Sequence, residues 1–298
     1  LIKFRESLVV ETLRPRLPEW LRRSLPSHSA ETTHRILAEQ KLNTVCESAL
    51  CPNRSECYSR NTATFMILGE VCTRSCSFCA ISPGKPQQVE ADEPERVAIA
   101  ARELGLKYVV ITSVARDEMP DEGAGHFART VEAVYKEIPG VQVEVLTPDF
   151  HARRELIAQV VAANPTVYNH NMETVERLQR QVRPQAGYAR TLEVLKIVKS
   201  LNPEMTTKSG LMLGLGETLD EVRQTAKDLR AAGCDILTLG QYLPPSKDHM
   251  KVAEYIFPET FQNLQVELKR LGFREVFSAP YVRSSYHAGE TFFNSISE

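Results

Sequence analysis

The sequence has no long hydrophobic run and no excess of either charge. Its longest apolar runs, such as 109–111 and 211–215, are far too short to cross a bilayer, and the N-terminus lacks the apolar core of a secretory signal. Lys and Arg number 36 against 38 Asp and Glu, which gives a formal net charge of −2 without any block of like charge. We therefore expect a cytoplasmic protein with neither a membrane nor a nucleic acid as its partner.

Signs of disorder are also lacking. Hydrophobic residues make up 42% and charged residues 25% of the 298 residues, an ordinary globular composition that can fill a sizeable core. This length exceeds that of most single domains, but barrels of parallel strands reach it as one unit. The expectation is one catalytic domain with extensions.

From residue 64 onward, short β-rich runs alternate with segments of helical periodicity. The predicted strands are Thr64–Gly69, Tyr108–Thr112, Val141–Leu146, Thr166–Asn169, Thr206–Leu213 and Ile236–Gly240. The predicted helices cover 29–40, 95–104, 124–137, 152–163, 188–200, 218–232 and 258–271. Six βα units favour an α/β fold built as a partial (β/α)6 barrel, with a doubly wound open sheet as the alternative. Either fold gathers its chemistry at the C-terminal ends of the strands.

This pattern divides the chain into three parts. Residues 1–60 form an N-terminal extension that starts as a proline-containing arm and ends in a cysteine-bearing loop. Residues 61–272 form the barrel, and residues 273–298 form a C-terminal tail.

Cysteines are scarce except in one stretch. Six of the seven lie between Cys46 and Cys79, and only Cys234 stands apart, as expected of a small buried residue. Such clustering in a cytosolic chain indicates metal or redox chemistry rather than disulfides.

The first motif directly follows the first predicted strand. Cys72, Cys76 and Cys79 are separated by three and then two residues. A [4Fe-4S] cluster normally takes four cysteines, so three thiolates leave one iron open to a small molecule. The alternative is a zinc knuckle whose fourth ligand lies elsewhere in the chain.

With Phe78 before its last cysteine, this motif resembles the signature of the radical S-adenosylmethionine (SAM) superfamily. The segment Gly210–Glu217 resembles that superfamily's Gly-x-Ile-x-Gly-x-x-Glu run, although Met212 departs from it. The resemblance implies a radical SAM partial barrel in which the open iron chelates SAM, and SAM cleavage yields a 5′-deoxyadenosyl radical. Polar residues at strand ends can instead be caps or turn residues. The cofactor-binding residues that the resemblance implies are Phe78, Thr112, Ser113, Asn169, Asn171 and Lys208.

A second motif lies upstream. Cys46, Cys51 and Cys57 are separated by four and then five residues, which is not a common zinc pattern. A second cluster that again lacks one protein ligand is the better hypothesis.

Both triplets, together with Arg283-Ser284-Ser285-Tyr286, resemble the lipoyl synthase family across essentially the whole chain. The resemblance implies an auxiliary [4Fe-4S] cluster on the upstream triplet, with Ser285, or in reserve Ser284, as its fourth ligand. A serine oxygen is a harder ligand than thiolate and suits a ligand that must leave as the cluster gives up sulfur. An ordinary hydrogen-bonded turn is the alternative for these serines.

The reaction implied is insertion of two sulfur atoms at carbons 6 and 8 of an octanoyl-lysine chain, with two SAM per turnover. The implied catalytic residues are Ser285 and the triplet Cys72, Cys76 and Cys79. The implied partners are octanoylated lipoyl carrier domains, either the H protein or the 2-oxoacid dehydrogenase E2, a reducing electron donor and an iron-sulfur cluster carrier.

Rival functions remain at this stage. Methylthiotransferases and biotin synthase are disfavoured by the upstream triplet, and a non-catalytic iron-sulfur or zinc protein would not cleave SAM. Asp117 and Glu118 are expected to be a solvated charge cluster. His151, His170 and His287 are given no catalytic role.

Overall fold

A computed structural model describes residues 17–22 and 30–296. Its main feature is an eight-stranded sheet in the order β1-β2-β5-β6-β7-β8-β9-β10. The strands are β1 (Asn43–Thr44), β2 (Thr64–Ile67), β5 (Tyr108–Ser113), β6 (Gln142–Leu146), β7 (Val167–Asn169), β8 (Thr206–Leu213), β9 (Ile236–Gln241) and β10 (Glu275–Ser278). A small separate sheet pairs β3 (Val71–Cys72) with β4 (Ser82–Pro83).

The sheet is a partial barrel. Strand β1 is antiparallel to β2, and every other neighbouring pair in the large sheet is parallel. From β2 to β10 the spatial order follows the chain order, without the reversal that defines a doubly wound sheet. Because β1 and β10 stay at opposite edges, the barrel is not closed. The predicted partial barrel is therefore confirmed.

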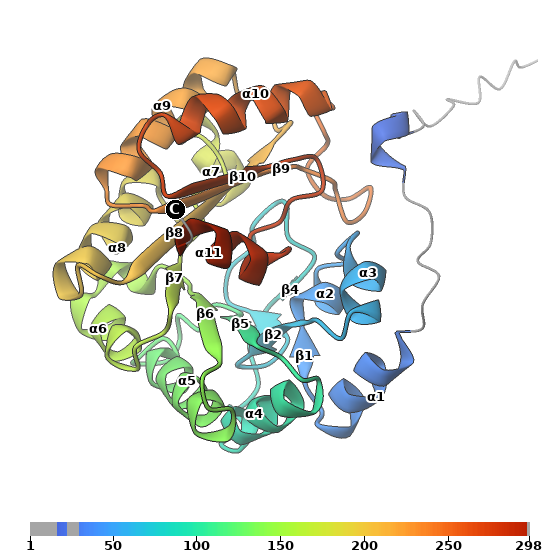
Figure 1. Cartoon of the computed structure of the whole chain (residues 1–298), viewed down its shortest axis with the longest axis vertical. Coiled ribbons are helices and arrows are strands. Elements are labelled where there is room, and N and C mark those ends of the chain that lie inside the picture. The colour runs from blue at the N-terminus through green and yellow to red at the C-terminus, as the bar shows by residue number, and fades with distance from the viewer. Residues whose placement is uncertain (1–16, 23–29, 297–298) are drawn as a thin grey trace, which may run out of the picture.

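Helices cover the outer face of the curved sheet (Figure 1). They are α4 (Glu93–Glu103), α5 (Ala124–Glu137), α6 (Arg154–Ala162), α8 (Tyr188–Leu201), α9 (Leu219–Ala231) and α10 (Pro258–Lys269). Helix α9 shows how local sequence starts a helix. The Thr218 hydroxyl accepts from the Glu221 backbone N–H, and the Glu221 carboxylate accepts from the Thr218 backbone N–H. This capping box starts the helix directly after the loop that leaves β8.

Shorter elements complete the described chain. Helices α1 (Glu31–Glu39), α2 (Val45–Ser48) and α3 (Arg54–Ser59) surround β1, and α7 (Gln179–Val182) follows β7. Single 3₁₀ turns lie at Glu19–Leu21, Phe150–Ala152 and Glu176–Leu178. No helix in the described ranges combines the length and apolar character needed to cross a membrane.

Helix α11 (Ala288–Ile296) packs at the N-terminal end of β5, within the ring of strands (Figure 1). The ring of Tyr108, the first residue of β5, lies 5.8 Å from that of Phe292 and 6.4 Å from that of Phe293. The opposite, C-terminal ends of the strands are thus left for the site.

The six predicted strands and seven predicted helices match observed elements to within two residues at each end, with residue 29 outside the described ranges. The predicted N-terminal arm also falls largely outside them. Strand β10 was missed: it lies within the predicted C-terminal tail and adds a seventh parallel strand beside β9. The short strand β1, within the N-terminal extension, was missed as well.

Candidate functional site

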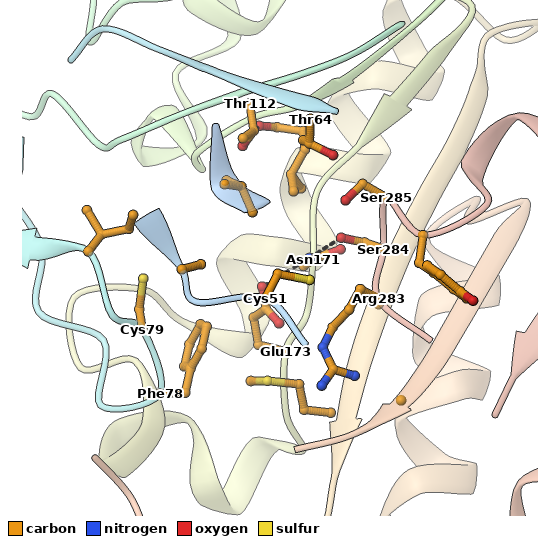
Figure 2. A pocket seen from close by; sticks show the side chains of 18 of the residues that line it. Cys51, Thr64, Phe78, Cys79, Thr112, Asn171, Glu173, Arg283, Ser284 and Ser285 are labelled. Carbon is orange, nitrogen blue, oxygen red and sulfur yellow. Dashed lines mark hydrogen bonds between the residues drawn. The ribbon is translucent and has the colours of Figure 1, made fainter. Parts of the chain in front are cut away.

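A cavity of about 370 Å³ lies at the C-terminal ends of the strands and contains both cysteine motifs. Figure 2 shows Phe78 and Cys79 on one side of it and Arg283, Ser284 and Ser285 on the other. The structure therefore brings together segments from the N-terminal extension, the barrel and the C-terminal tail. Predicted site residues that line the cavity are Cys46, Cys51, Cys57, Cys72, Cys76, Phe78, Cys79, Thr112, Ser113, Asn171, Ser284 and Ser285.

The downstream cysteines lie on β3 and the loop that follows it. The Cys72 Sγ accepts backbone N–H groups of Arg74 at 3.4 Å and Ala115 at 3.3 Å. Burial raises the pKa of the Cys76 thiol to about 12 and that of Cys79 to about 11. Since iron binds thiolate, loading this loop must release protons.

The upstream cysteines lie on and between two short helices. Cys46 is in α2, whose first turn is capped by the Thr44 hydroxyl at 3.3 Å from the Glu47 nitrogen, and Cys57 is in α3. Between them, the Cys51 backbone N–H donates to the Cys46 carbonyl at 3.2 Å. Burial raises the pKa of Cys46 to about 11. This segment thus presents three thiols, none of them in a disulfide, to the cavity.

The C-terminal segment is tied directly to this upstream loop. The Asn53 side chain donates to the Tyr281 carbonyl at 2.8 Å, and the Tyr286 hydroxyl donates to both carboxylate oxygens of Glu56 at 3.1 Å. A Cβ at Gly240 would lie 1.9 Å from the Val282 carbonyl oxygen, so only glycine lets the segment cross β9 this closely.

The two candidate serines differ in their contacts. The Ser284 Oγ accepts from the Asn171 side-chain amide at 3.2 Å. Within the described ranges, the Ser285 hydroxyl forms no side-chain hydrogen bond, and it points into the cavity (Figure 2). Ser285 is therefore the hydroxyl that remains available to a ligand.

Three predicted SAM contacts, Ser113, Asn169 and Asn171, present unsatisfied polar atoms, and two of them, Ser113 and Asn171, line the cavity. The Ser113 Oγ and the Asn171 Oδ1 are buried without a hydrogen-bond partner in the described chain. Thr112, by contrast, donates to the Leu146 carbonyl at 2.8 Å. Because buried polar atoms are normally paired, the orphaned oxygen atoms fit a site that binds a polar group.

Asn169 and Lys208 do not reach the cavity. The Lys208 ammonium lies 3.0 Å from both carboxylate oxygens of Glu144, and the Asn169 amide donates to Glu144 at 2.8 Å. Tyr108 also donates to Glu144, at 2.8 Å. Lys208 and Glu144 are 1% and 0% exposed, so they form a buried ion pair inside the barrel. The geometry does not support the prediction that these two residues bind the cofactor.

Sequence reasoning missed four charged residues that line the cavity, Arg74, Asp149, Glu173 and Arg183. Burial raises the pKa of Glu173, and the Arg183 guanidinium opposes that rise. Glu173 accepts from the Asn171 amide at 3.0 Å, and Arg183 donates to the Asn171 carbonyl at 2.6 Å. Glu173 could have been found, because it continues the alternation 169, 171, 173 after the fourth predicted strand.

The glycine-rich segment after β8 builds its own turn. The carboxylate of Glu217 accepts backbone N–H groups of Gly214 at 2.5 Å and Leu215 at 2.9 Å. A Cβ at Gly210 would lie 3.0 Å from the Asn171 Oδ1. Gly210 therefore leaves room for Asn171, while Glu217 has a structural role.

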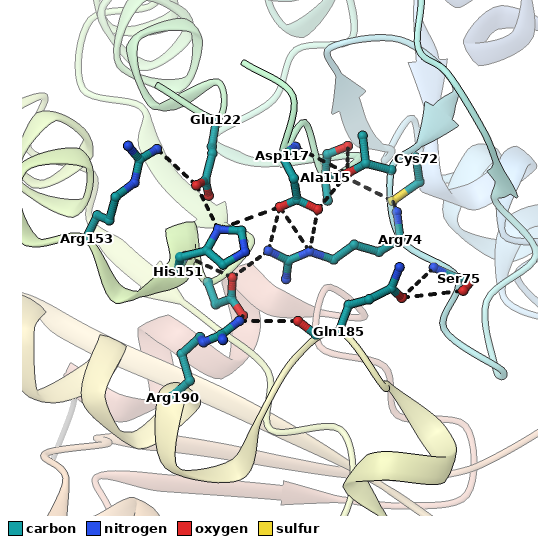
Figure 3. Close-up of polar contacts among 12 residues, drawn as sticks. Cys72, Arg74, Ser75, Ala115, Asp117, Glu122, His151, Arg153, Gln185 and Arg190 are labelled. Atoms are coloured by element: carbon teal, nitrogen blue, oxygen red, sulfur yellow. Dashed lines mark hydrogen bonds and ion pairs between the residues drawn. The ribbon is translucent and has the colours of Figure 1, made fainter. Parts of the chain in front are cut away.

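Asp117 was expected to be a solvated charge, but neighbouring side chains bind it. It accepts hydrogen bonds from Thr73 at 2.7 Å and from the Arg74 side chain at 2.6 Å (Figure 3). Glu118, by contrast, is exposed and paired with Arg116. Asp117 also lies near Glu122 and His151, with one ligand atom of each within 4.8 Å of the others. Arg74 already pairs with the carboxylate of Asp117, and Arg153 with that of Glu122.

His170 is buried and structural. Its ring contacts the Thr147 carbonyl at 2.9 Å and the Thr191 hydroxyl at 3.3 Å. Burial lowers its pKa to about 4, so the ring is neutral at pH 7. Cys234 is fully buried, as expected.

This chain resembles known proteins. The model of the Radical SAM superfamily matches residues 66–229. Lipoyl synthase of Caldanaerobacter subterraneus subsp. tengcongensis is 54% identical over 273 residues, which cover 92% of this chain and 96% of that protein. Lipoyl synthase 2 of Gloeobacter violaceus is 54% identical over 281 residues, which cover 94% and 97%.

Solved structures show the same fold at low identity. Methylornithine synthase (PylB) aligns with a TM-score of 0.54 and 14% identity, covering 83% of this chain and 71% of that one. Streptococcus suis SuiB bound to S-adenosylmethionine aligns with a TM-score of 0.55 and 11% identity, covering 76% and 54%. Together with the near full-length relatives, the motifs in the cavity lead to one assignment: the chain belongs to the lipoyl synthase family of the radical SAM superfamily.

Proposed function

We propose that this chain is a lipoyl synthase, which inserts sulfur at carbons 6 and 8 of a protein-bound octanoyl-lysine chain. The observation that carries this proposal is that both cysteine triplets and Ser285 line a single cavity. A substrate carbon between them is within reach of a radical from one side and of sulfur from the other. An electron-transfer protein has no need for such a shared cavity.

The downstream triplet is assigned to the SAM-binding cluster. Cys72, Cys76 and Cys79 hold three irons and leave the fourth for the amino and carboxylate groups of SAM. Around it, the unpaired oxygen atoms of Ser113 and Asn171 are available to the polar parts of SAM. Phe78 and Thr112 also line this space, and Glu173 adds a carboxylate suited to the SAM ammonium.

The upstream triplet is assigned to the auxiliary cluster. Cys46, Cys51 and Cys57 supply thiolates, and Ser285 supplies the fourth ligand because Ser284 is engaged by Asn171. When bound, the two clusters and SAM supply a 5′-deoxyadenosyl radical and the sulfur atoms, with two SAM used per turnover. The protein's own part is to hold the two triplets around one cavity and to exclude water from it.

Partners and location follow from this reaction. The substrate is an octanoylated carrier domain, of the H protein or the E2 type. An electron donor must reduce the SAM-side cluster, and a cluster carrier must replace the spent auxiliary cluster. The cytoplasm, where thiols stay reduced, is the proposed location.

The test is anaerobic incubation with an octanoyl-lysine peptide, SAM and reductant, followed by mass analysis of the peptide. The expected product gains the mass of two sulfur atoms as the dithiol, or of two sulfur atoms less two hydrogen atoms after oxidation to the disulfide. Formation of 5′-deoxyadenosine with an unchanged peptide would reject the proposal, and assays for modified tRNA and for biotin would then identify the rival activities.

A further inference from the structure

Thr73 and Arg74 fasten the first cysteine loop to the C-terminal end of β5. The Thr73 backbone N–H and its hydroxyl both donate to the Ala115 carbonyl at 3.1 Å. The Thr73 hydroxyl also lies 2.7 Å from the Asp117 carboxylate. The two residues after Cys72 are thus held against residues 115–117.

Arg74 extends this attachment to a second strand end. Its guanidinium donates to Asp117 through both Nε and Nη2, and Nη2 lies 2.7 Å from Asp149, which follows β6 (Figure 3). The Arg74 side chain is 7% exposed and that of Asp149 only 1%. Arg190 lies 3.1 Å from the other oxygen of Asp149. A buried guanidinium shared by two carboxylates in this way has little freedom to rearrange.

This attachment also positions the two backbone N–H groups that donate to the Cys72 sulfur. The Arg74 N–H donates from one side of the Thr73–Ala115 contact and the Ala115 N–H from the other, at 3.4 Å and 3.3 Å. Hydrogen bonds to cluster sulfur ligands stabilise the more negative, reduced state and so raise the reduction potential. The positive charge of Arg74 acts in the same direction.

We propose that Arg74 is a positioning residue that sets the reduction potential of the SAM-side cluster, by clamping the Cys72 loop to Asp117 and Asp149. The inference rests on the proposed assignment of Cys72, Cys76 and Cys79 to that cluster. Arg74 acts through the Cys72 sulfur and its two N–H donors.

The experiment is a redox titration of the reconstituted holoenzyme, monitored by electron paramagnetic resonance, for the parent, Arg74→Gln and Arg74→Lys. The auxiliary cluster is the internal reference. Arg153→Gln is the matched control, because Arg153 bonds Glu122 and the Pro120 carbonyl in the same region without touching the cysteine loop. Iron content shows whether each variant keeps both clusters.

For Arg74→Gln, the reduced fraction of the SAM-side cluster at fixed potential is expected to fall about tenfold, equivalent to about 59 mV for a one-electron couple. The reduced fraction in Arg74→Lys is expected to lie between those of Arg74→Gln and the parent. The lysine ammonium keeps the charge but cannot span two carboxylates as the planar guanidinium does. The auxiliary cluster and Arg153→Gln should keep parental potentials. If Arg74→Gln does not retain its clusters, the shift in reduction potential measured for Arg74→Lys alone tests the proposal.

An unchanged SAM-side potential in a variant with full iron content would overturn the role of Arg74. Equal shifts in both clusters would also overturn it, because they would show a general structural effect. Failure of the underlying assignment looks different: Cys72→Ala would then keep the signal of the SAM-binding cluster.

Discussion

The side-chain amide of Asn53 donates a hydrogen bond to the carbonyl oxygen of Tyr281, 2.8 Å away, across 228 positions of sequence. Asn53 lies between Cys51 and Cys57, and Tyr281 precedes Ser285 by four residues. This contact, together with that of Tyr286 with Glu56, therefore holds the three upstream thiols near their proposed oxygen ligand.

Replacement of Asn53 with alanine should weaken retention of the auxiliary cluster. The lost hydrogen bond is worth about 1 kcal/mol, and the partner carbonyl is left without its donor. Iron content after anaerobic reconstitution should drop from about eight per chain towards four, the content of one remaining cluster. Asn263→Ala, at an exposed position on α10, is the control and should keep the parental content. Equal iron content in both variants would contradict this prediction.

The two triplets should separate two activities. Cys51→Ala should still form 5′-deoxyadenosine from SAM but make no carbon–sulfur bond, because only the sulfur source is removed. Cys76→Ala should lose both activities, since no radical forms. Cys234→Ser, at a buried position away from both triplets, should leave the iron content intact. Loss of SAM cleavage in Cys51→Ala would show that the triplets do not have separate roles.

The two serines should also differ. Ser285→Ala should abolish product formation, or slow it by at least about a hundredfold, as expected when a reaction loses a group that acts directly. Ser284→Ala removes only the acceptor of the Asn171 amide and should have an effect of about tenfold or less. Product yields measured by mass spectrometry, at equal iron content, test this order. The reverse order would assign the ligand to Ser284.

Lys208 should matter for stability rather than for SAM binding. Lys208→Met leaves Glu144 buried and unpaired and should lower the free energy of unfolding by about 3–5 kcal/mol. Combining it with Glu144→Leu removes the stranded charge and should restore most of that loss. The double variant should bind SAM with near-parental affinity by equilibrium dialysis. Strongly weakened binding would instead place Lys208 in contact with the cofactor.

His170 should make the chain sensitive to acid. Burial lowers its pKa to about 4 in the folded chain against 6.5 for an exposed histidine, so the folded state resists protonation. The resulting stability is fully present above pH 6.5 and is lost as pH falls through 6.5 towards 4, by about 3 kcal/mol in all. Urea unfolding of the parent should show this loss, and His170→Gln should show less of it. Parallel pH profiles for the two proteins would refute the assignment.

The barrel could be predicted because its strands and helices are long enough to show their periods. Strand β10 escaped notice because four residues, Glu275–Ser278, carry only two buried positions, too few to distinguish a strand from a tail. The cysteine motifs were recognisable from spacing alone. The meeting of these motifs with Ser285 in one cavity depends on contacts over more than 200 residues, such as that of Tyr286 with Glu56, which no local pattern encodes.

The position of Asn169 and Lys208 outside the cavity has a geometric cause. Alternation along a strand tells which face a residue occupies but not how deep it lies in a barrel. Asn169 pairs with Lys208 in register, whereas Asn171 lies against Gly210, two residues further along β8. Asn169 and Lys208 thus belong to the layer below, where the Asn169 amide nitrogen and the Lys208 ammonium bond Glu144.

The close approach of Val282 to Gly240 has a consequence for biogenesis. Synthesis proceeds from the N-terminus, so the six clustered cysteines leave the ribosome long before the segment that crosses Gly240. A nascent chain can therefore present the six clustered thiols before the segment that carries Ser285 has been made. Maturation of the auxiliary centre therefore has to wait until the chain has been made through Ser285, whereas the three cysteines of the other centre are all present once residue 79 has been made.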